Sequence, residues 1–440
     1  MWCWMSPMSR TRRSGLSWVL LSILSLATLT ACAGDASAED SRITFWAVNM
    51  GPTLEENQQL LDRELAEFTD ETGIEVDLEV IAWPDLYTRL MTAVGSGQGP
   101  DVVNIGNTWS ATLQDTGALL AFDDEAMEAI GGADKFVDVT LTATGAAGKP
   151  PASIPYLGQA FGLFYNTELF AEAGIDSPPT TWAELVADAK RLTGPGRWGL
   201  SLSAASATGN AQLAFILGRQ EGAELFGPDG QPQLDAPEAQ AAVRRLVDLM
   251  ARDRVVNPSD AEQSGVTDAM VALADGRAAM VPYQSSGRGY LASVGFDDYA
   301  VAPLPVLDPL PAGGVPVSSF VAGTNLAVLA KTEHPDLAIE LVRFLTSEDE
   351  QATLNAAFKT LPVVESAYAD PAFTDPATQM FGTILQNHSE SVPMVPGEGQ
   401  MEQLLGGAIS QLWAKVATGG NVTDEDIAAA LRDADRQMPD

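Results

Sequence analysis

The chain has 440 residues, of which 59 are acidic and 24 are Lys or Arg, so its formal charge at pH 7 is −35. Nucleic-acid binding needs a clustered cationic surface, so this balance argues against nucleic acid as a partner. With 46% hydrophobic residues the chain is expected to form about two globular domains. Two Cys and two His leave little for a disulfide framework, and no metal or cofactor is expected.

The first part of the chain has the order of an export signal. Three Arg residues precede an uncharged apolar stretch at 16–31, which is shorter than the roughly 20 residues that span a bilayer. The stretch ends in a motif similar to the lipobox of bacterial lipoproteins, Leu29-Thr30-Ala31-Cys32. We therefore predict a lipoprotein signal peptide at residues 1–31 and lipidation at Cys32. The alternative is an ordinary signal peptide with a chance Cys.

Residues 32–42 are mostly small and polar, and they are expected to form a flexible tether. A lipidated Cys32 would hold the folded body at the extracytoplasmic face of the cell membrane, with the lipid anchor as its contact with the bilayer. Either Met1 or Met8 can be the start of translation.

The first half of the folded body alternates between strands and helices. Residues 43–48 are predicted to be a buried strand, followed by an amphipathic helix that Gly73 ends. Residues 74–80 alternate between apolar and acidic side chains, which is typical of a strand with one covered face. A helix at about 85–94 and a strand at 101–105 follow. This order predicts a parallel sheet, in which ligands gather at the carboxyl ends of the strands.

The same alternation resumes after Pro150. Thr181 and Glu184 have the spacing of a capping box, ahead of a helix that runs to about residue 192. Residues from 334 onward are predicted to be mostly helical. Further strands are predicted at 278–282, 299–303 and 324–329. Two α/β lobes, each a mostly parallel sheet flanked by helices, would account for these elements.

Motifs for catalysis are missing from the sequence. It contains no G-x-x-x-x-G-K-[ST] phosphate loop, no G-x-G-x-x-G after a strand and no G-x-S-x-G elbow. His334 precedes a Pro at a helix start and His388 lies in a polar segment, so both are expected at the surface. Without a nucleophile or base to name, we expect that the chain is not an enzyme.

Aromatic, amide and hydroxyl side chains gather instead at predicted strand ends. Asn107, Thr108 and Trp109 follow one strand, and Tyr283 and Ser285 end another. Flat aromatic faces beside hydrogen-bonding groups suit a neutral sugar.

Several tryptophan residues of the chain also have a structural interpretation. Trp109 can cover a helix end, Trp46 lies inside its strand and can pack beneath the site, and Trp83 can hold the helix that follows it. Trp182 is expected to be structural because it lies inside the capping box.

Several longer segments, in this order, resemble one protein family: FTDETGIEVDLEVIAW, GQGPDVVNIGNTW, IPYLGQAFGLFYNTELFAEAGI, GRAAMVPYQSSG and SSFVAGTNLAV. The chain resembles the extracellular solute-binding proteins of ABC importers, of the maltose-binding type, over nearly all of its mature length. The resemblance implies a two-lobed periplasmic-binding-protein-like fold of class II, with a three-segment hinge and a sugar bound between the lobes.

The resemblance also implies where the lobes and the ligand contacts lie. The N-terminal lobe would comprise residues 43–152 plus 300–346, and the C-terminal lobe residues 153–299 plus 347–440. Ligand contacts are implied at Asn49, Asn107, Thr108, Trp109, Gln159, Tyr283, Ser319 and Phe320, and the position of Ser285 at a strand end adds it to this set. Residues 404–408 are glycine-rich where maltose binders carry aromatics, which leaves the size of the ligand open.

These observations predict a monomeric binding lipoprotein that captures a mono- to oligosaccharide and passes it to the membrane subunits of an ABC permease. Two alternatives stay open. One is a carrier of another solute, with Arg288 clamping an amino acid or peptide, or with acids and aromatics binding a polyamine. The other is an exported carbohydrate-active enzyme.

Overall fold

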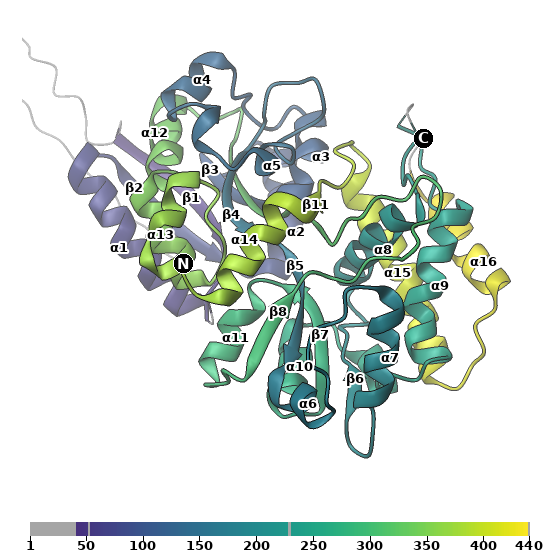
Figure 1. Cartoon of the computed structure of the whole chain (residues 1–440). Helices are drawn as coiled ribbons and strands as arrows, with labels where there is room; N and C mark the ends of the chain where they lie inside the picture. Colours follow the sequence, from purple (N-terminus) through teal and green to yellow (C-terminus); the bar gives the residue numbers. More distant parts are fainter. Residues whose placement is uncertain (1–40, 52, 228–229, 439–440) are drawn as a thin grey trace, which may run out of the picture. The chain divides into compact units, whose positions relative to one another are not determined.

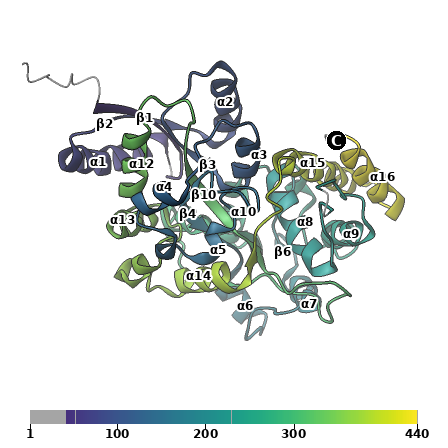
Figure 2. The same cartoon turned by 90° about the horizontal axis from the view of Figure 1, so that it is seen from above.

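Two β-sheets organise the chain, and each is the centre of one lobe (Figures 1 and 2). The computed structural model describes residues 41–51, 53–227 and 230–438. The predicted signal peptide, most of the tether and Cys32 lie outside the described residues.

The first sheet has the strand order β2-β1-β3-β10-β4. β1 pairs in parallel with β2 and β3, while β10 is antiparallel to both β3 and β4. All five residues of β3 are buried, which is why its sequence VVNIG does not alternate. The strands are β1 (Arg42–Val48), β2 (Glu75–Ile81), β3 (Val102–Gly106), β4 (Ile154–Gln159) and β10 (Ala322–Val328).

Helices cover this sheet to form the first lobe. Thr53 caps the start of α1, and Gly73 ends it in a left-handed conformation with φ of 75°, as predicted. Phe68 of α1 packs on Phe344 of α12, with ring centroids 5.2 Å apart. The helices of this lobe are α1 (Leu54–Thr72), α2 (Trp83–Ser96), α3 (Ser110–Asp115), α4 (Asp124–Ala129), α5 (Asp138–Leu141), α12 (Pro335–Leu345) and α13 (Glu348–Phe358).

The second sheet has the order β6-β7-β5-β8 and is the centre of the second lobe. β5 is antiparallel to β7 and β8, and β6 is parallel to β7. The predicted capping box is present around Trp182. The strands are β5 (Phe161–Asn166), β6 (Trp198–Leu200), β7 (Ala278–Gln284) and β8 (Tyr299–Ala302).

The remaining α-helices belong to the second lobe or, for α14, lie where the two lobes meet. They are α6 (Thr167–Glu172), α7 (Trp182–Leu192), α8 (Ala207–Glu221), α9 (Pro237–Ala251), α10 (Val266–Ala274), α11 (Gly287–Ser293), α14 (Pro376–His388), α15 (Glu398–Ala417) and α16 (Asp424–Asp435). Among the described residues, no helix is both long and apolar enough to cross a bilayer.

Both sheets are mixed, so the prediction of mostly parallel sheets is wrong. A parallel neighbour needs a crossover connection within one lobe, as between β1 and β2. β10 instead enters the first sheet from the second lobe, and it runs antiparallel to both of its neighbours.

The lobe boundaries predicted at 152–153, 299–300 and 346–347 do not coincide with the strand pairing. β4 pairs with β10 in the first sheet, and β8 pairs with β5 in the second. Leu354 of α13 lies in the apolar core of the first lobe, and Gln351 Nε2 donates to Tyr156 O of β4 at 2.9 Å. The passages between lobes therefore lie later in the chain than predicted.

The glycine-rich segment at 404–408 allows α15 to pack closely on α8. A Cβ at Gly406 would lie 1.8 Å from the backbone oxygen of Ala207. Asn210 of α8 joins the same two helices, because its Nδ2 donates to Ser410 Oγ at 2.9 Å and its Oδ1 accepts from Trp413 Nε1 at 3.1 Å. The glycine thus serves helix packing at this position.

This packing predicts opposite effects for two neighbouring glycines. Gly406→Ala should destabilise the protein by about 1–3 kcal/mol, because the new methyl group overlaps a backbone atom. Gly407→Ala, with no atom within 4 Å of the new Cβ, should stabilise α15 by about 0.5–1 kcal/mol. Urea unfolding of both variants measures this, and equal effects would contradict the close packing.

Candidate functional site

The chain passes between the two lobes in three places. β4 and β5 are separated by Ala160 alone, and β9 (Ser319–Phe320) leads into β10 through Val321. The third passage follows α14, where β11 (Ser389–Glu390) pairs in parallel with β9 before the chain enters α15. Most of the residues predicted to bind ligand lie beside these passages.

Two of the predicted residues hydrogen-bond to the passages themselves. Asn107 Nδ2 donates to Val321 O at 2.8 Å, and the N–H of Ser285 donates to Ala160 O at 3.0 Å. Asn107 and Ser285 therefore fix the backbone where it changes lobe.

Ser319 and Phe320 have contacts that are already complete. Ser319 Oγ accepts from the N–H of Phe161 at 2.8 Å and donates to Phe320 O at 2.7 Å. The ring of Phe320 is buried, with its centroid 5.7 Å from that of Phe161. These two residues hold the first and second passages together, and their contacts leave no group free for a ligand.

Three of the predicted residues carry buried polar atoms that make no hydrogen bond within the described part of the chain. They are Asn49 Oδ1 after β1, Gln159 Oε1 at the end of β4 and Ser285 Oγ after β7. A buried polar atom without a partner costs about 1–3 kcal/mol. These atoms can each accept a hydrogen bond from a hydroxyl-bearing ligand or from water.

Aromatic side chains of the first lobe form an aromatic cluster, consisting of Trp83, Tyr87 and Trp109. Trp109 in the short helix η2 (Asn107–Trp109) lies 5.1 Å from Trp83 at 31° and 4.9 Å from Tyr87 at 65°, between ring centroids. Trp109 is 8% exposed and Thr108 is 7% exposed, so both are buried, whereas Trp83 is 40% exposed. Trp83 therefore presents the accessible face of the cluster.

Tyr283 lies on the second lobe, at the end of β7. Its ring is half-buried and its centroid lies 6.2 Å from that of Phe161. Burial raises the pKa of Tyr283 to about 12. The phenol stays protonated at physiological pH, so it can donate a hydrogen bond.

Sequence reasoning missed two buried carboxylates of α15. Glu398 is 1% exposed and Glu402 is 5% exposed. Glu398 Oε2 has no hydrogen-bond partner among the described residues. Glu402 Oε1 accepts from Gln212 Nε2 at 3.3 Å, and Gln212 Oε1 accepts from Gln284 Nε2 at 3.2 Å. The signal was helical spacing: positions 398 and 402 share a face with the apolar residues at 401 and 405.

These two acids lie where the second lobe meets the aromatic cluster. Thr112 Oγ1 of α3 donates to Pro396 O at 2.9 Å, just before α15 begins. Burial, and then the charge of Glu398, raise the pKa of Tyr87. A Cβ at Gly399 would lie 3.8 Å from the hydroxyl oxygen of Tyr87. The aromatic cluster and the carboxylates thus lie on the two sides of one junction between the lobes.

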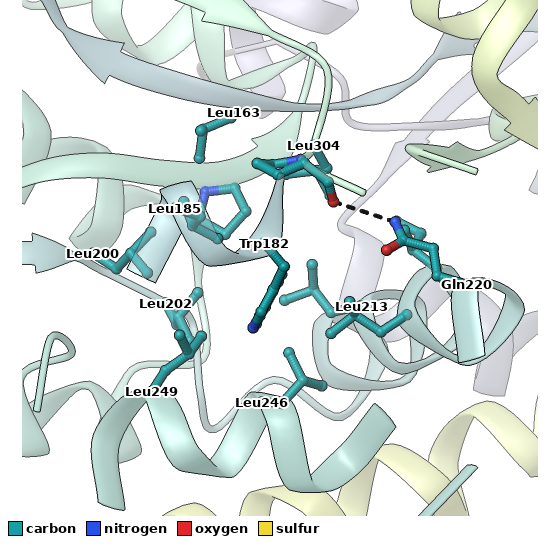
Figure 3. A pocket seen from close by; sticks show the side chains of 14 residues that line it. Leu163, Trp182, Leu185, Leu200, Leu202, Leu213, Gln220, Leu246, Leu249 and Leu304 are labelled. Atoms are coloured by element: carbon teal, nitrogen blue, oxygen red, sulfur yellow. Dashed lines mark hydrogen bonds between the residues drawn. The ribbon is translucent and has the colours of Figure 1, made fainter. Parts of the chain in front are cut away.

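An apolar cavity of about 30 Å³ lies elsewhere, inside the second lobe (Figure 3). Leucine side chains and Trp182 surround it, and none of the predicted site residues lines it. Gln220 at its edge donates to Pro305 O at 3.3 Å and to Val317 O at 2.7 Å, so its amide is already used. The cavity is a feature of core packing, and Trp182 is structural as predicted.

Among the described residues, the junction offers no set of ligands for zinc, because it contains no Cys and a single His cannot form a zinc site. His388 is exposed at the end of α14, and His334 precedes α12. In the described part of the chain, a group of acidic side chains with the spacing of metal ligands lies on α1 and α13 of the first lobe.

Comparison with known proteins identifies the family of the chain. Residues 51–352 match the family of bacterial extracellular solute-binding proteins. The chain belongs to this family. Its members bind solutes and are not enzymes, so the prediction that the chain is not an enzyme is confirmed.

An uncharacterized lipoprotein of Streptomyces antibioticus is 28% identical over 70% of this chain and 68% of its own length. The maltotriose-binding protein of Pyrococcus abyssi is 25% identical over 86% of this chain and 79% of its own length.

Solved structures confirm the two-lobed fold. An ABC transporter solute-binding protein from Thermotoga lettingae, bound to α-D-tagatose, has a TM-score of 0.75 at 21% identity, covering 90% of this chain and 99% of that one. Maltose-bound MalE3 of T. maritima also has a TM-score of 0.75 at 21% identity, covering 89% and 98%.

The buried acids of this solute-binding protein predict a pH-dependent stability. Burial raises the pKa of Glu398 and of Glu402, and the charge of Glu402 raises that of Glu398 further. The folded state therefore holds protons that the unfolded state releases, so these acids destabilise the fold as the pH rises through their raised pKa values.

Glu402→Gln should remove part of this loss while keeping an acceptor for Gln212. The melting temperature of Glu402→Gln minus that of the wild type should therefore increase between pH 5 and pH 9. Glu238→Gln, which alters an exposed acid of α9, is the matched control and should give a constant difference. Parallel melting profiles for Glu402→Gln and the wild type would contradict the burial of an ionisable pair.

Proposed function

We propose that this solute-binding protein captures a sugar, from a monosaccharide to an oligosaccharide, between its lobes and delivers it to the membrane subunits of an ABC-type import permease. The observation that carries this proposal is the arrangement of the junction. An aromatic cluster with the exposed face of Trp83 lies on one side, and a buried array of acceptors and amides lies on the other.

This arrangement suits the two kinds of surface that a sugar has. The C–H face of a pyranose packs on an aromatic ring, while its hydroxyls donate to carboxylates and accept from amides. Glu398 Oε2 and Gln159 Oε1 lack a donor within the described residues, and a sugar hydroxyl supplies one. The sugars named for the Pyrococcus and Thermotoga proteins support a carbohydrate ligand and leave its length open.

An amino-acid or peptide ligand has less support, because the donors of Arg288 are engaged. Its Nη1 donates to Thr378 Oγ1, its Nη2 to Lys359 O at 2.8 Å and its Nε to Ser285 O at 3.3 Å. Arg288 is buried and holds neighbouring segments together, so it is poorly placed to clamp a ligand carboxylate.

A polyamine is the second candidate, and one observation favours it. Glu398 and Glu402 form no ion pair with any cationic side chain of the described residues, and they lie beside the aromatic cluster. Carboxylates together with aromatic faces bind organic cations. A ligand screen should therefore contain both classes.

A binding screen tests the proposal. Thermal-shift measurements on residues 33–440 should find at least one sugar that raises the melting temperature, with polyols, amino acids and polyamines screened in parallel. A shift from polyamines alone would favour the cation carrier instead.

With that sugar, two tryptophan variants should separate the binding site from the core. Trp83→Ala should weaken binding by about 0.5–1.5 kcal/mol, or roughly two- to twelvefold, with little change in the melting temperature without ligand. Trp182→Ala should lower the melting temperature and leave the affinity nearly unchanged, because Trp182 borders the core cavity. Calorimetry measures both, and exchanged outcomes would place the site elsewhere.

We also propose that the mature protein is a lipoprotein anchored through Cys32 at the extracytoplasmic face of the membrane. The lipobox-like motif and the lipoprotein of Streptomyces antibioticus support this anchor. Mass spectrometry of the native membrane fraction should find a chain that begins with a lipid-modified Cys32. An unmodified chain that begins at another residue would contradict it.

A further inference from the structure

A group of three carboxylates lies in the first lobe and takes no part in the junction. Glu64 and Glu67 belong to α1, and Glu350 belongs to α13, which lies beside α1 in Figure 1. One oxygen from each side chain lies within 4.8 Å of the other two. Glu64 and Glu350 are buried, while Glu67 is exposed.

This carboxylate group lacks a close cation among the described residues. Glu67 and Glu350 form no ion pair there, and Arg63 Nη2 lies 3.9 Å from Glu64 Oε1 on an exposed side chain. Glu71 and Asp349 add further negative charge next to Glu350. Within the described residues, the ion pair with Arg63 thus offsets only part of the repulsion within the group.

An independent observation comes from Tyr156 on β4, a third element. Tyr156 is 2% exposed, and its hydroxyl has no hydrogen-bond partner among the described residues. Burial, and then the charges of Glu350 and Glu64, raise the pKa of this phenol, so Tyr156 lies within electrostatic reach of the carboxylate group. Glu350 Oε2 is also buried without a partner. The phenol and the carboxylate therefore each keep a buried polar atom that a ligand can use.

We propose that Glu64, Glu67 and Glu350 form a calcium-binding site that fastens α13 to α1. The donors are all oxygens, which favours a hard cation over zinc. Calcium accepts six to eight oxygens in variable geometry, and water can reach it beside the exposed Glu67, whereas magnesium demands a nearly ideal octahedron. The Tyr156 hydroxyl would hydrogen-bond to a water bound to the ion.

The expected affinity follows from the location of the protein. Calcium sites of extracellular modules have dissociation constants of about 10⁻⁴–10⁻³ M, which suits an ion that is abundant outside the cell. Because Gln351 of α13 also bonds to the backbone of Tyr156, the ion would strengthen an existing link between α13, α1 and β4. Calcium would then stabilise the first lobe whichever solute the junction binds.

The test uses chelator-treated protein of residues 33–440 in the absence of any sugar. Millimolar CaCl₂ should raise the melting temperature by mass action, and MgCl₂ or NaCl at equal ionic strength should raise it much less. Titration calorimetry should give one calcium per chain. Glu350→Gln and Glu67→Gln should each abolish the calcium-dependent shift, and Tyr156→Phe should weaken binding about tenfold.

Glu55→Gln is the matched control, because it removes one exposed charge from the other end of α1 and should keep the full shift. Glu67→Gln alters an exposed residue, so loss of its calcium response cannot be ascribed to misfolding. A shift of equal size with NaCl, or one that persists in both glutamine variants, would overturn the site. An equal response to MgCl₂ would overturn the assignment of calcium.

Discussion

The hydrogen bonds that join the three passages between the lobes are the constraint on which the binding site depends. The N–H of Phe161, in the first passage, donates to Ser319 Oγ in the second, and the N–H of Val321 in the second donates to Glu390 O in the third at 3.1 Å. The passages therefore lie together as one layer between the sheets. Any residue next to them is placed within reach of both lobes, which is why Asn107, Gln159 and Ser285 meet there although they are far apart in sequence.

The elements of the fold were predictable from the sequence where their signals are local. Gly73 and the capping box at Thr181 specify helix ends through contacts within a few residues, and both are present as predicted. The choice of sheet is different. Residues 299–303 have the composition of a strand, but only long-range pairing with β5 places that strand in the second lobe. For this reason β1, β2, β3, β7, β8 and β10 were predicted from the sequence while the lobe boundaries were not.

The candidate site was likewise predictable from the sequence only in part. The loops at the strand ends were predictable, because a sheet gathers the ends of its strands. The contribution of each side chain was not predictable, since burial decides it. Ser319 and Phe320 make their contacts within the passages between the lobes, and the ring of Trp109 packs against Trp83 and Tyr87. The acids of α15 were hidden by a composition in which acidic residues are common, although their helical spacing with apolar neighbours marks them as buried.

Burial divides the acidic residues of this chain into solvated and buried carboxylates. Most of the acidic residues can be solvated at the surface, but Glu398, Glu402, Glu64 and Glu350 are not, and each buried carboxylate needs a proton, a donor or a cation. The surroundings decide which of these is available. Glu402 accepts a hydrogen bond from the amide N–H of Gln212, near the aromatic cluster. The neutral hydroxyls of a sugar can donate to a carboxylate in the same way. The group on α1 and α13 places three carboxylates together with no amide donor from the described residues, so neutral donors alone would leave their mutual repulsion in place. For the same residue type we therefore propose two different partners, a solute at the junction and an ion in the first lobe.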